Sequence, residues 1–207
     1  MKIYTKKEAI STITKCAKLY KDNFMDCNLL FVYFDKSKKV ATLEVLFEKS
    51  NFLHLTGLTL NSKELKAKYF FEKCINNKLA ENDFELDGKK FVHQKLLVMS
   101  SMFNSPYLKI NMIGNYKEYH PKLFTNKIAG NTVGCLGFYN IKNKIIPNTL
   151  LKEDVRDIDE NYCRVIATYK KPRQAKIYTN KIYNAKGINL DTIDFPEKIE
   201  YLKSINT

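Results

Sequence analysis

The sequence predicts an α+β fold in which N-terminal helices pack on an antiparallel β-sheet. Helix-capping signals and helical periodicity dominate the first half of the chain, and short strand-like segments dominate the second half. Segregation of helices from strands favours an antiparallel sheet over βαβ layers. The 207 residues are 44% hydrophobic, so the chain can bury a substantial core, and no Pro/Gly/Ser-rich linker divides it. We therefore expect one domain over residues 1–207.

A capping box marks the start of the first helix. Thr5 and Glu8 have the spacing at which each side chain accepts a hydrogen bond from the other residue's backbone amide. Ile13, Ala17 and Tyr20 follow at helical spacing, so we expect them on the buried face of this helix.

An apolar run and an alternating segment come next and predict a β-hairpin. The run covers residues 29–34 and the alternating segment covers 40–47. The polar residues 35–38 between them are typical of a turn.

The later elements follow from the same criteria. A second capping signal at residues 61–64 predicts a helix that runs to about residue 77, and a third helix is expected over 89–103, ahead of Pro106. A last short helix is expected to start at 194–197. The strands between them are expected at residues 107–113, 123–129, 133–141, 144–150, 164–169 and 175–183.

The charge distribution indicates a polyanionic partner. The formal net charge is +13. The abundance of Lys is typical of an AT-rich genome, but such a bias also raises Asp and Glu and does not by itself create the imbalance. Residues 109–152 hold seven Lys or Arg against one Asp or Glu, residues 163–187 hold seven against none, and the acidic stretch 153–162 lies between them. Basic clusters are the electrostatic signature of phosphate binding, so we expect RNA or another nucleic acid as partner.

Cysteine usage predicts a reducing compartment. The five Cys are odd in number and widely spaced, and no C-x-x-C pair occurs, which argues against a disulfide framework and against a zinc site. The sequence shows no secretory signal and no apolar run of about 18 residues. We expect a cytoplasmic protein with no membrane partner.

Common cofactor and metal motifs are missing from the sequence. There is no P-loop, and the glycines of residues 130–137 do not have dinucleotide-binding spacing, which favours a tight turn into a packed strand. His54, His93 and His120 are far apart, and none has an acidic pair at ligand spacing. We therefore expect no cofactor and no metal site.

His54 is the candidate for proton transfer. Residues 52–56 alternate in a way that predicts a strand with His54 and Thr56 on one face, next to Gly57, where a phosphate can approach closely. The alternative is a structural histidine on a half-buried strand.

The segment from Lys122 to Asn131 contains candidates for phosphate binding. Lys127 and Asn131 border a glycine turn, where they can present a cation and an amide to a phosphate. The alternative is an ordinary solvated strand edge, where Lys is common.

Lys152 and Arg156 form a second candidate group. Arg156 is one of three Arg in a chain that otherwise uses Lys, and its planar guanidinium matches phosphate oxygens. An ion pair between Arg156 and Asp154 or Asp157 is the alternative.

Several of these segments resemble a phage-associated nuclease family, the fourth phage group of the barnase/EndoU/colicin/RelE-like superfamily. The segments occur in the family's order over about residues 7–188 and are 52–57, 121–131, 134–138, 147–156 and 185–187. The resemblance implies N-terminal helices on an antiparallel sheet. It also implies metal-independent RNA cleavage, in which the ribose 2′-hydroxyl attacks the adjacent phosphorus and a 2′,3′-cyclic phosphate is left.

The resemblance also implies a location in the cytoplasm of a bacterial host, with a host or immunity protein as a possible further partner. It implies roles for individual residues as well. His54 is the candidate general acid or base. The candidates for binding phosphate, stabilising charge or positioning substrate are Lys127 and Arg156 in the catalytic group and Thr56, Lys122, Asn131 and Lys152 in the substrate-binding group.

Two other functions are compatible with the sequence. One is a non-enzymatic basic protein that binds nucleic acid or inhibits a host nucleic-acid machine. The other is a metal-dependent nuclease that uses Glu153, Asp154 and Asp157.

Overall fold

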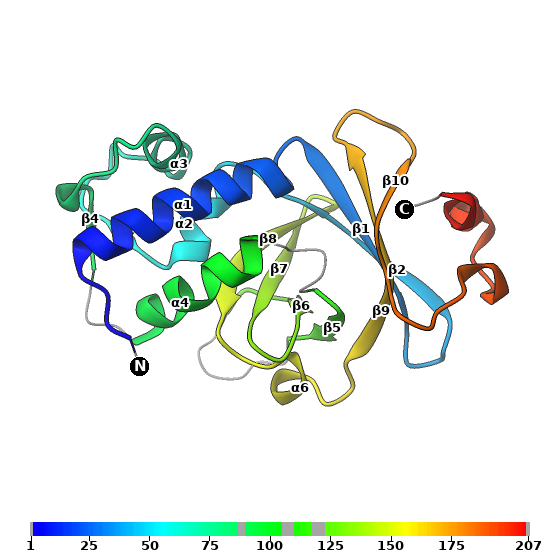
Figure 1. Cartoon of the computed structure of the whole chain (residues 1–207). Coiled ribbons are helices and arrows are strands. Elements are labelled where there is room, and N and C mark those ends of the chain that lie inside the picture. Colours follow the sequence, from blue (N-terminus) through cyan, green and yellow to red (C-terminus); the bar gives the residue numbers. More distant parts are fainter. Residues whose placement is uncertain (1, 87–89, 105–109, 117–122, 206–207) are drawn as a thin grey trace.

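The computed structural model describes residues 2–86, 90–104, 110–116 and 123–205. Its main element is a curled antiparallel sheet (Figure 1). Its strands are β1 (Cys27–Phe34), β2 (Val40–Leu46), β5 (Met112–Asn115), β6 (Lys127–Gly130), β7 (Cys135–Ile141), β8 (Lys144–Leu151), β9 (Cys163–Pro172) and β10 (Asn180–Asn184). Within the described residues the order is β2-β1-β9-β5-β6-β7-β8, with β10 paired to β9.

The helices precede most of the sheet in the sequence, as expected. They are α1 (Lys6–Phe24), α2 (Asn51–Thr56), α3 (Ala67–Ile75), α4 (Lys90–Asn104) and α6 (Val155–Ile158). Short 3₁₀ helices are η1 (Glu81–Asp83), η2 (Leu190–Thr192) and η3 (Glu197–Ser204), and a small separate sheet pairs β3 (Thr59–Leu60) with β4 (Phe84–Glu85). The predicted α+β class with an antiparallel sheet is confirmed.

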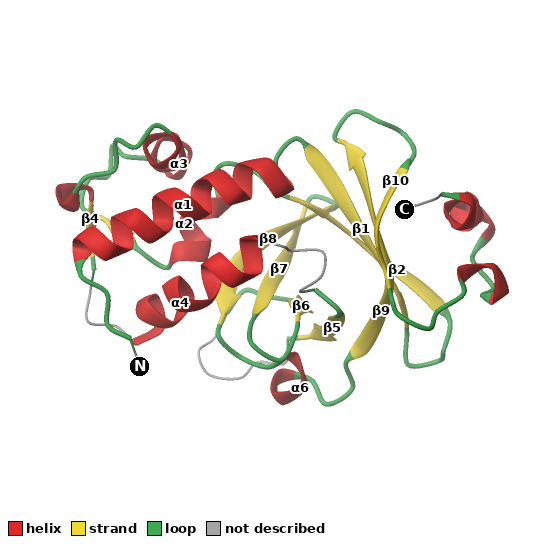
Figure 2. Ribbon diagram, viewed as in Figure 1, coloured by secondary structure: helices red, strands yellow, loops and turns green. Residues whose placement is uncertain are grey.

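Two layers cover the sheet (Figure 2). Helices α1 to α4 lie on one side, where aromatic rings such as Tyr20, Phe47 and Phe52 pack edge-to-face in the main core. The C-terminal segment with η2 and η3 covers β1 and β9 on the other side, through residues such as Leu190 and Leu202. Burial on both faces explains why β1 is an almost continuous apolar run rather than an alternating one.

The curl of the sheet positions the β7–β8 hairpin. β8 ends the strand order, yet it lies against β2 at the other end of the order and against α2. The edge strand β8 is therefore covered by a short helix, and the site described below forms where the two meet.

The first elements agree with the sequence predictions. Thr5 and Glu8 form a complete capping box at the start of α1, and Ile13, Ala17 and Tyr20 are fully buried. The predicted hairpin is β1–β2. The predicted tight turn before a packed strand is also confirmed, because β7 begins at Cys135 within the glycine-rich segment.

Several predicted elements differ in the structure. Strands β6 and β10 begin at Lys127 and Asn180, four and five residues later than predicted. Residues 52–56 form helix α2, not a strand. The second predicted helix begins at Ala67 instead of near residue 61, because the Ser62 hydroxyl accepts a bond from the Glu64 amide in a local turn and caps no helix. The last helix is a 3₁₀ helix that starts after Pro196 without a side-chain cap. Residues 107–109 of one predicted strand and residue 89 of the third predicted helix lie outside the described part of the chain.

Candidate functional site

His54 lies on the exposed side of α2, close to the end of this one-and-a-half-turn helix. Gly57 ends the helix with φ +74°, a conformation that favours glycine. Phe52 and Leu55 anchor α2 in the core, which leaves His54 at the surface. Among the described residues the imidazole of His54 has no hydrogen-bond partner, and the residue lines a pocket.

Thr56 does not share a face with His54. The prediction that a strand places both side chains on one face was wrong. Thr56 is fully buried, and its hydroxyl donates to the Leu53 carbonyl at 2.7 Å and accepts from the Leu58 amide at 3.2 Å. These hydrogen bonds stabilise the turn that follows α2. A helix rotates each residue by about 100°, which separates positions that a strand would place together.

Lys95, on α4, adds a cation to the site. Its ammonium donates to the His54 carbonyl at 3.1 Å and to the Thr149 hydroxyl at 3.0 Å. A lysine ammonium has three N–H donors, so these two bonds leave one donor for a ligand. The Lys95 stem packs over Gly57, where an added Cβ would lie 2.9 Å from the Lys95 Cδ.

The pKa values of His54 and Lys95 are both lowered by their surroundings. Although His54 is exposed overall, the protein around its ring excludes part of the water, and this burial lowers the pKa of the imidazole below its ordinary value. The positive charge of Lys95 lowers the pKa of His54 further. Burial lowers the pKa of Lys95 to about 8. At pH 7, His54 is therefore neutral and able to accept a proton, while Lys95 is mostly ionised.

A pocket of about 430 Å³ opens beside His54. Three separate parts of the chain form it: α2, the residues that precede β6, and the β7–β8 hairpin. The lining residues are Asn51, His54, Leu123, Phe124, Tyr139, Ile141, Ile146, Pro147 and Asn148. Three segments that resemble the nuclease family, 52–57, 121–131 and 147–156, thus meet at one place. Its volume is in the range of small-ligand sites.

Hydrogen bonds fix the floor of this pocket. The Thr125 hydroxyl donates to Asn148 Oδ1 at 3.0 Å, and Asn148 Nδ2 donates to the Phe124 carbonyl. Beneath them Gly137 permits close packing, because an added Cβ would lie 2.6 Å from the Thr149 Cγ2 and 2.8 Å from the Thr125 Cγ2. The glycine brings β7 against both threonines and thereby sets the position of the Lys95 acceptor, Thr149.

Lys127 belongs to a different cluster. Its ammonium donates to Asn115 Oδ1 at 2.6 Å, and the backbone amide of Asn115 donates to Asp159 Oδ2 at 2.8 Å. Asp159 is 1% exposed and ends helix α6. The pocket beside His54 is not lined by Lys127 or by Arg156, so the structure does not bring the three predicted catalytic residues together there.

Arg156 forms the ion pair that the sequence left open as an alternative. Its guanidinium donates to Asp154 at 2.7–3.1 Å, and the Asp154 carboxylate also caps α6 by accepting from the Arg156 amide. Hydrogen bonds from Arg156 lower the pKa of Asp154. The guanidinium is half exposed, so the pair leaves part of it open to solvent.

The remaining predicted binding residues occupy varied positions. Asn131 Oδ1 accepts from the amides of Val133 at 2.7 Å and Gly134 at 3.2 Å, so its side chain shapes the turn before β7. Lys152 is exposed at the end of β8. Lys122 lies outside the described residues.

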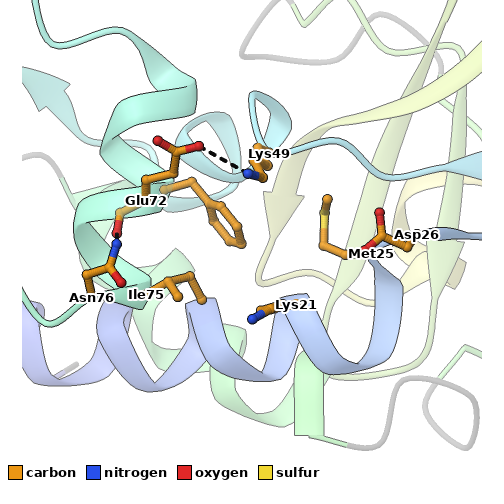
Figure 3. Close-up of a pocket in the computed structure, with 8 residues that line it drawn as sticks. Lys21, Met25, Asp26, Lys49, Glu72, Ile75 and Asn76 are labelled. Atoms are coloured by element: carbon orange, nitrogen blue, oxygen red, sulfur yellow. Dashed lines mark hydrogen bonds and ion pairs between the residues drawn. The ribbon is translucent and has the colours of Figure 1, made fainter.

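A second cavity, of about 320 Å³, lies between α1 and α3 (Figure 3). It is lined by apolar Met25 and Ile75 and by the ion pair between Lys49 and Glu72, whose charged atoms are 3.0 Å apart. Lys21 and Asp26 also line it, and no histidine does. Its chemistry is less suited to proton transfer than that of the His54 pocket.

Within residues 2–86, 90–104, 110–116 and 123–205, no three His, Cys, Asp or Glu side chains are grouped as a metal would need. The same part of the chain contains no helix with the length and apolarity to cross a membrane.

The sequence pointed to His54, which lines the pocket, but not to its neighbours Lys95 and Thr149. Lys95 is one of many lysines in the sequence, and it lies on a helix that is otherwise apolar on its buried side. One sequence feature could have indicated Lys95: it is close in the helical pattern to Val92, Leu96 and Met99, which form the buried apolar face of α4. Its contact with His54 spans 41 residues and could not be inferred from local spacing.

Comparison with known proteins identifies one family. A family model described as phage-Barnase-EndoU-ColicinE5/D-RelE like nuclease4 matches residues 12–187, which include His54, Lys95 and all of the described pocket residues. No curated protein and no solved structure matched the chain.

Proposed function

The chain belongs to the phage-Barnase-EndoU-ColicinE5/D-RelE like nuclease4 family, and from this premise we propose that it cleaves RNA, without a metal ion, at the pocket beside His54. The proposed reaction is transesterification by the ribose 2′-hydroxyl. The observation that carries the proposal is the His54 imidazole at the pocket, unpartnered among the described residues, with the Lys95 ammonium 3.1 Å from the His54 carbonyl although Lys95 is not itself a lining residue.

The proposed reaction needs a proton acceptor, a proton donor and a cation. His54 removes the proton from the 2′-hydroxyl as the O2′–P bond forms, because its lowered pKa keeps it neutral at pH 7. The P–O5′ bond breaks, and the departing O5′ takes a proton from the Lys95 ammonium. The products are a 2′,3′-cyclic phosphate and a free 5′-hydroxyl, and exchange with solvent restores both side chains.

Lys95 also suits the charge that develops at phosphorus. An ammonium with a free N–H in a partly dry site stabilises the non-bridging oxygens more strongly than the same group in water. A pKa of about 8 places Lys95 close enough to neutral pH to donate a proton as well.

Lys127, Lys152 and Arg156 keep a supporting role in the proposal. They lie outside the pocket, and we assign them to phosphates that flank the cleaved bond. Cations outside the reacting centre contribute to affinity in a salt-dependent way and do not need to touch the reacting atoms.

The proposal predicts cleavage of RNA that persists in excess EDTA and leaves cyclic phosphate ends. The reason is that the two proton-transfer groups belong to the protein, and the attacking group belongs to the RNA. Gel analysis with and without EDTA, followed by mass determination of the product ends, measures both properties. Cleavage that stops with EDTA and returns with magnesium would refute the proposal, as would 5′-phosphate ends.

A substrate control isolates the attacking group. The same RNA with 2′-O-methyl groups at every position keeps its charge and bases but lacks the 2′-hydroxyl. We expect it to remain intact under conditions that cleave the unmodified strand.

A further inference from the structure

We propose that the pocket beside His54 binds an unpaired nucleobase by stacking it on Phe124 and Tyr139, so that the substrate is a single strand and not a duplex. This inference rests on the proposed nuclease site and adds the substrate class to it. It begins from Phe124, whose side chain is 80% exposed although it is a large apolar group.

An exposed phenyl group next to a pocket is unfavourable unless a ligand covers it. Phe124 leaves its ring in water, and Ile141, in the same pocket, is 42% exposed. Full burial of such side chains is worth about 1.5–3 kcal/mol each, so their exposure at one concave site indicates a binding surface.

The backbone of Phe124 is held in place although its ring is free. Asn148 Nδ2 donates to the Phe124 carbonyl, and Thr125 donates to Asn148 Oδ1 at 3.0 Å. Thr125 is 6% exposed and packs against Gly137. A ring on a fixed backbone loses little conformational freedom when a base stacks on it, which favours binding.

The β7–β8 ladder supplies the rest of the surface. Tyr139 pairs with Ile146, and two residues further along the strands Ile141 pairs with Lys144. Directly paired residues of an antiparallel ladder point to the same face, so this face runs from an aromatic ring to a lysine over about 7 Å. The turn that follows exposes Lys142 next to Lys144.

The charge of this surface fits an anionic strand. The described residues that line the pocket include no Asp or Glu. Two lysines adjoin lining residues: Lys95 donates to the His54 carbonyl, and Lys144 pairs with Ile141 in the ladder. A base stacked on Phe124 and Tyr139 can therefore have a phosphate near either cation. Every base has a π-face, so stacking selects unpaired bases without selecting a sequence. Bases in a duplex are already stacked and cannot enter.

The test uses short DNA strands, because they lack the 2′-hydroxyl and stay intact under the proposed chemistry. Fluorescence anisotropy measures the affinity of the full chain for a single strand, for the same strand in a duplex, and for an abasic strand of the same length and charge. Each is compared in wild type, in Phe124→Ala, and in Tyr69→Ala, which removes an exposed aromatic ring on α3 outside the pocket.

Stacking on one ring is worth about 5- to 150-fold in affinity by alanine substitution. We expect Phe124→Ala to lose this factor for the normal single strand and to bind the abasic strand as wild type does. Tyr69→Ala should bind every strand as wild type does. Equal affinity of wild type for the normal and the abasic strand would overturn the inference, and so would an equal loss in Phe124→Ala on both. Phe124→Leu, which keeps the apolar bulk, should recover less affinity than Phe124→Tyr.

The two proposals can fail separately. Cleavage of the DNA strands would contradict the 2′-hydroxyl mechanism, yet the abasic comparison would still report stacking. Conversely, loss of RNA cleavage in Phe124→Ala without any preference for bases would contradict stacking alone.

Discussion

Replacing His54 with alanine is expected to reduce the rate of RNA cleavage by roughly 10²–10⁴-fold, because a positioned general base contributes about that factor. The melting temperature should stay close to that of wild type. His54 is exposed, and the imidazole makes no hydrogen bond among the described residues, so its removal takes little from the fold. Single-turnover cleavage and thermal denaturation on the same preparation measure both quantities.

His93→Ala is the matched control for this prediction. His93 is 4% exposed, its Nδ1 accepts from the Tyr4 amide at 3.1 Å, and its ring stacks on Tyr4. Loss of such a buried partner typically costs about 1–3 kcal/mol of stability, while the cleavage rate of the folded fraction should be unchanged. If His54→Ala instead lowered the melting temperature and kept its rate, His54 would be the structural histidine.

Lys95→Met is expected to abolish most cleavage and at the same time to stabilise the fold. Burial lowers the pKa of Lys95 from its ordinary value to about 8, so the ionised side chain opposes folding at pH 7. Each unit of pKa corresponds to about 1.4 kcal/mol, and partial solvent screening together with the lost bond to Thr149 leaves an expected gain of about 1 kcal/mol.

The pH dependence of stability checks the sign of this effect. The unfolded chain binds the Lys95 proton more tightly than the folded chain does, so wild-type stability should rise as pH increases from about 8 toward 10.5. Lys95→Met should lose that part of the rise. Urea denaturation at several pH values measures it.

Lys73→Met is the control, because its ammonium has a carboxylate partner, Asp83, at 2.5 Å. Removing Lys73 should lower stability slightly and leave the cleavage rate as in wild type. A destabilised but fully active Lys95→Met would show that Lys95 serves the fold and not the reaction.

The predictions from sequence succeeded where local signals control structure. The capping box at Thr5 and Glu8 defines the start of α1, and the apolar run of β1 with its polar turn defines a hairpin. The prediction of a strand at residues 52–56 was wrong, because a stretch of only five or six residues can fit both the helical period and the strand period. In this stretch the buried positions and Gly57, which favours a helix end, decided for a helix.

The site could be predicted only in part, for a different reason. His54 could be selected from its residue type and its segment, but its partners come from α4 and β8, which are far away in the sequence. The basic residues chosen from their local segments, Lys127 and Arg156, are engaged with Asn115 and Asp154. Composition identifies a charged surface, whereas only tertiary structure shows which cation is desolvated next to the imidazole.

The dependence of the cleavage rate on pH tests the central claim most directly, namely that neutral His54 accepts a proton while ionised Lys95 acts beside it. We expect a bell-shaped profile with its rising limb below pH 6.5 and its falling limb near pH 8. The rising limb should disappear from the residual activity of His54→Ala, and the falling limb from that of Lys95→Met. A rate that is flat between pH 5 and 9, or limbs that persist unchanged in both variants, would contradict the assignment of this pocket as the catalytic site.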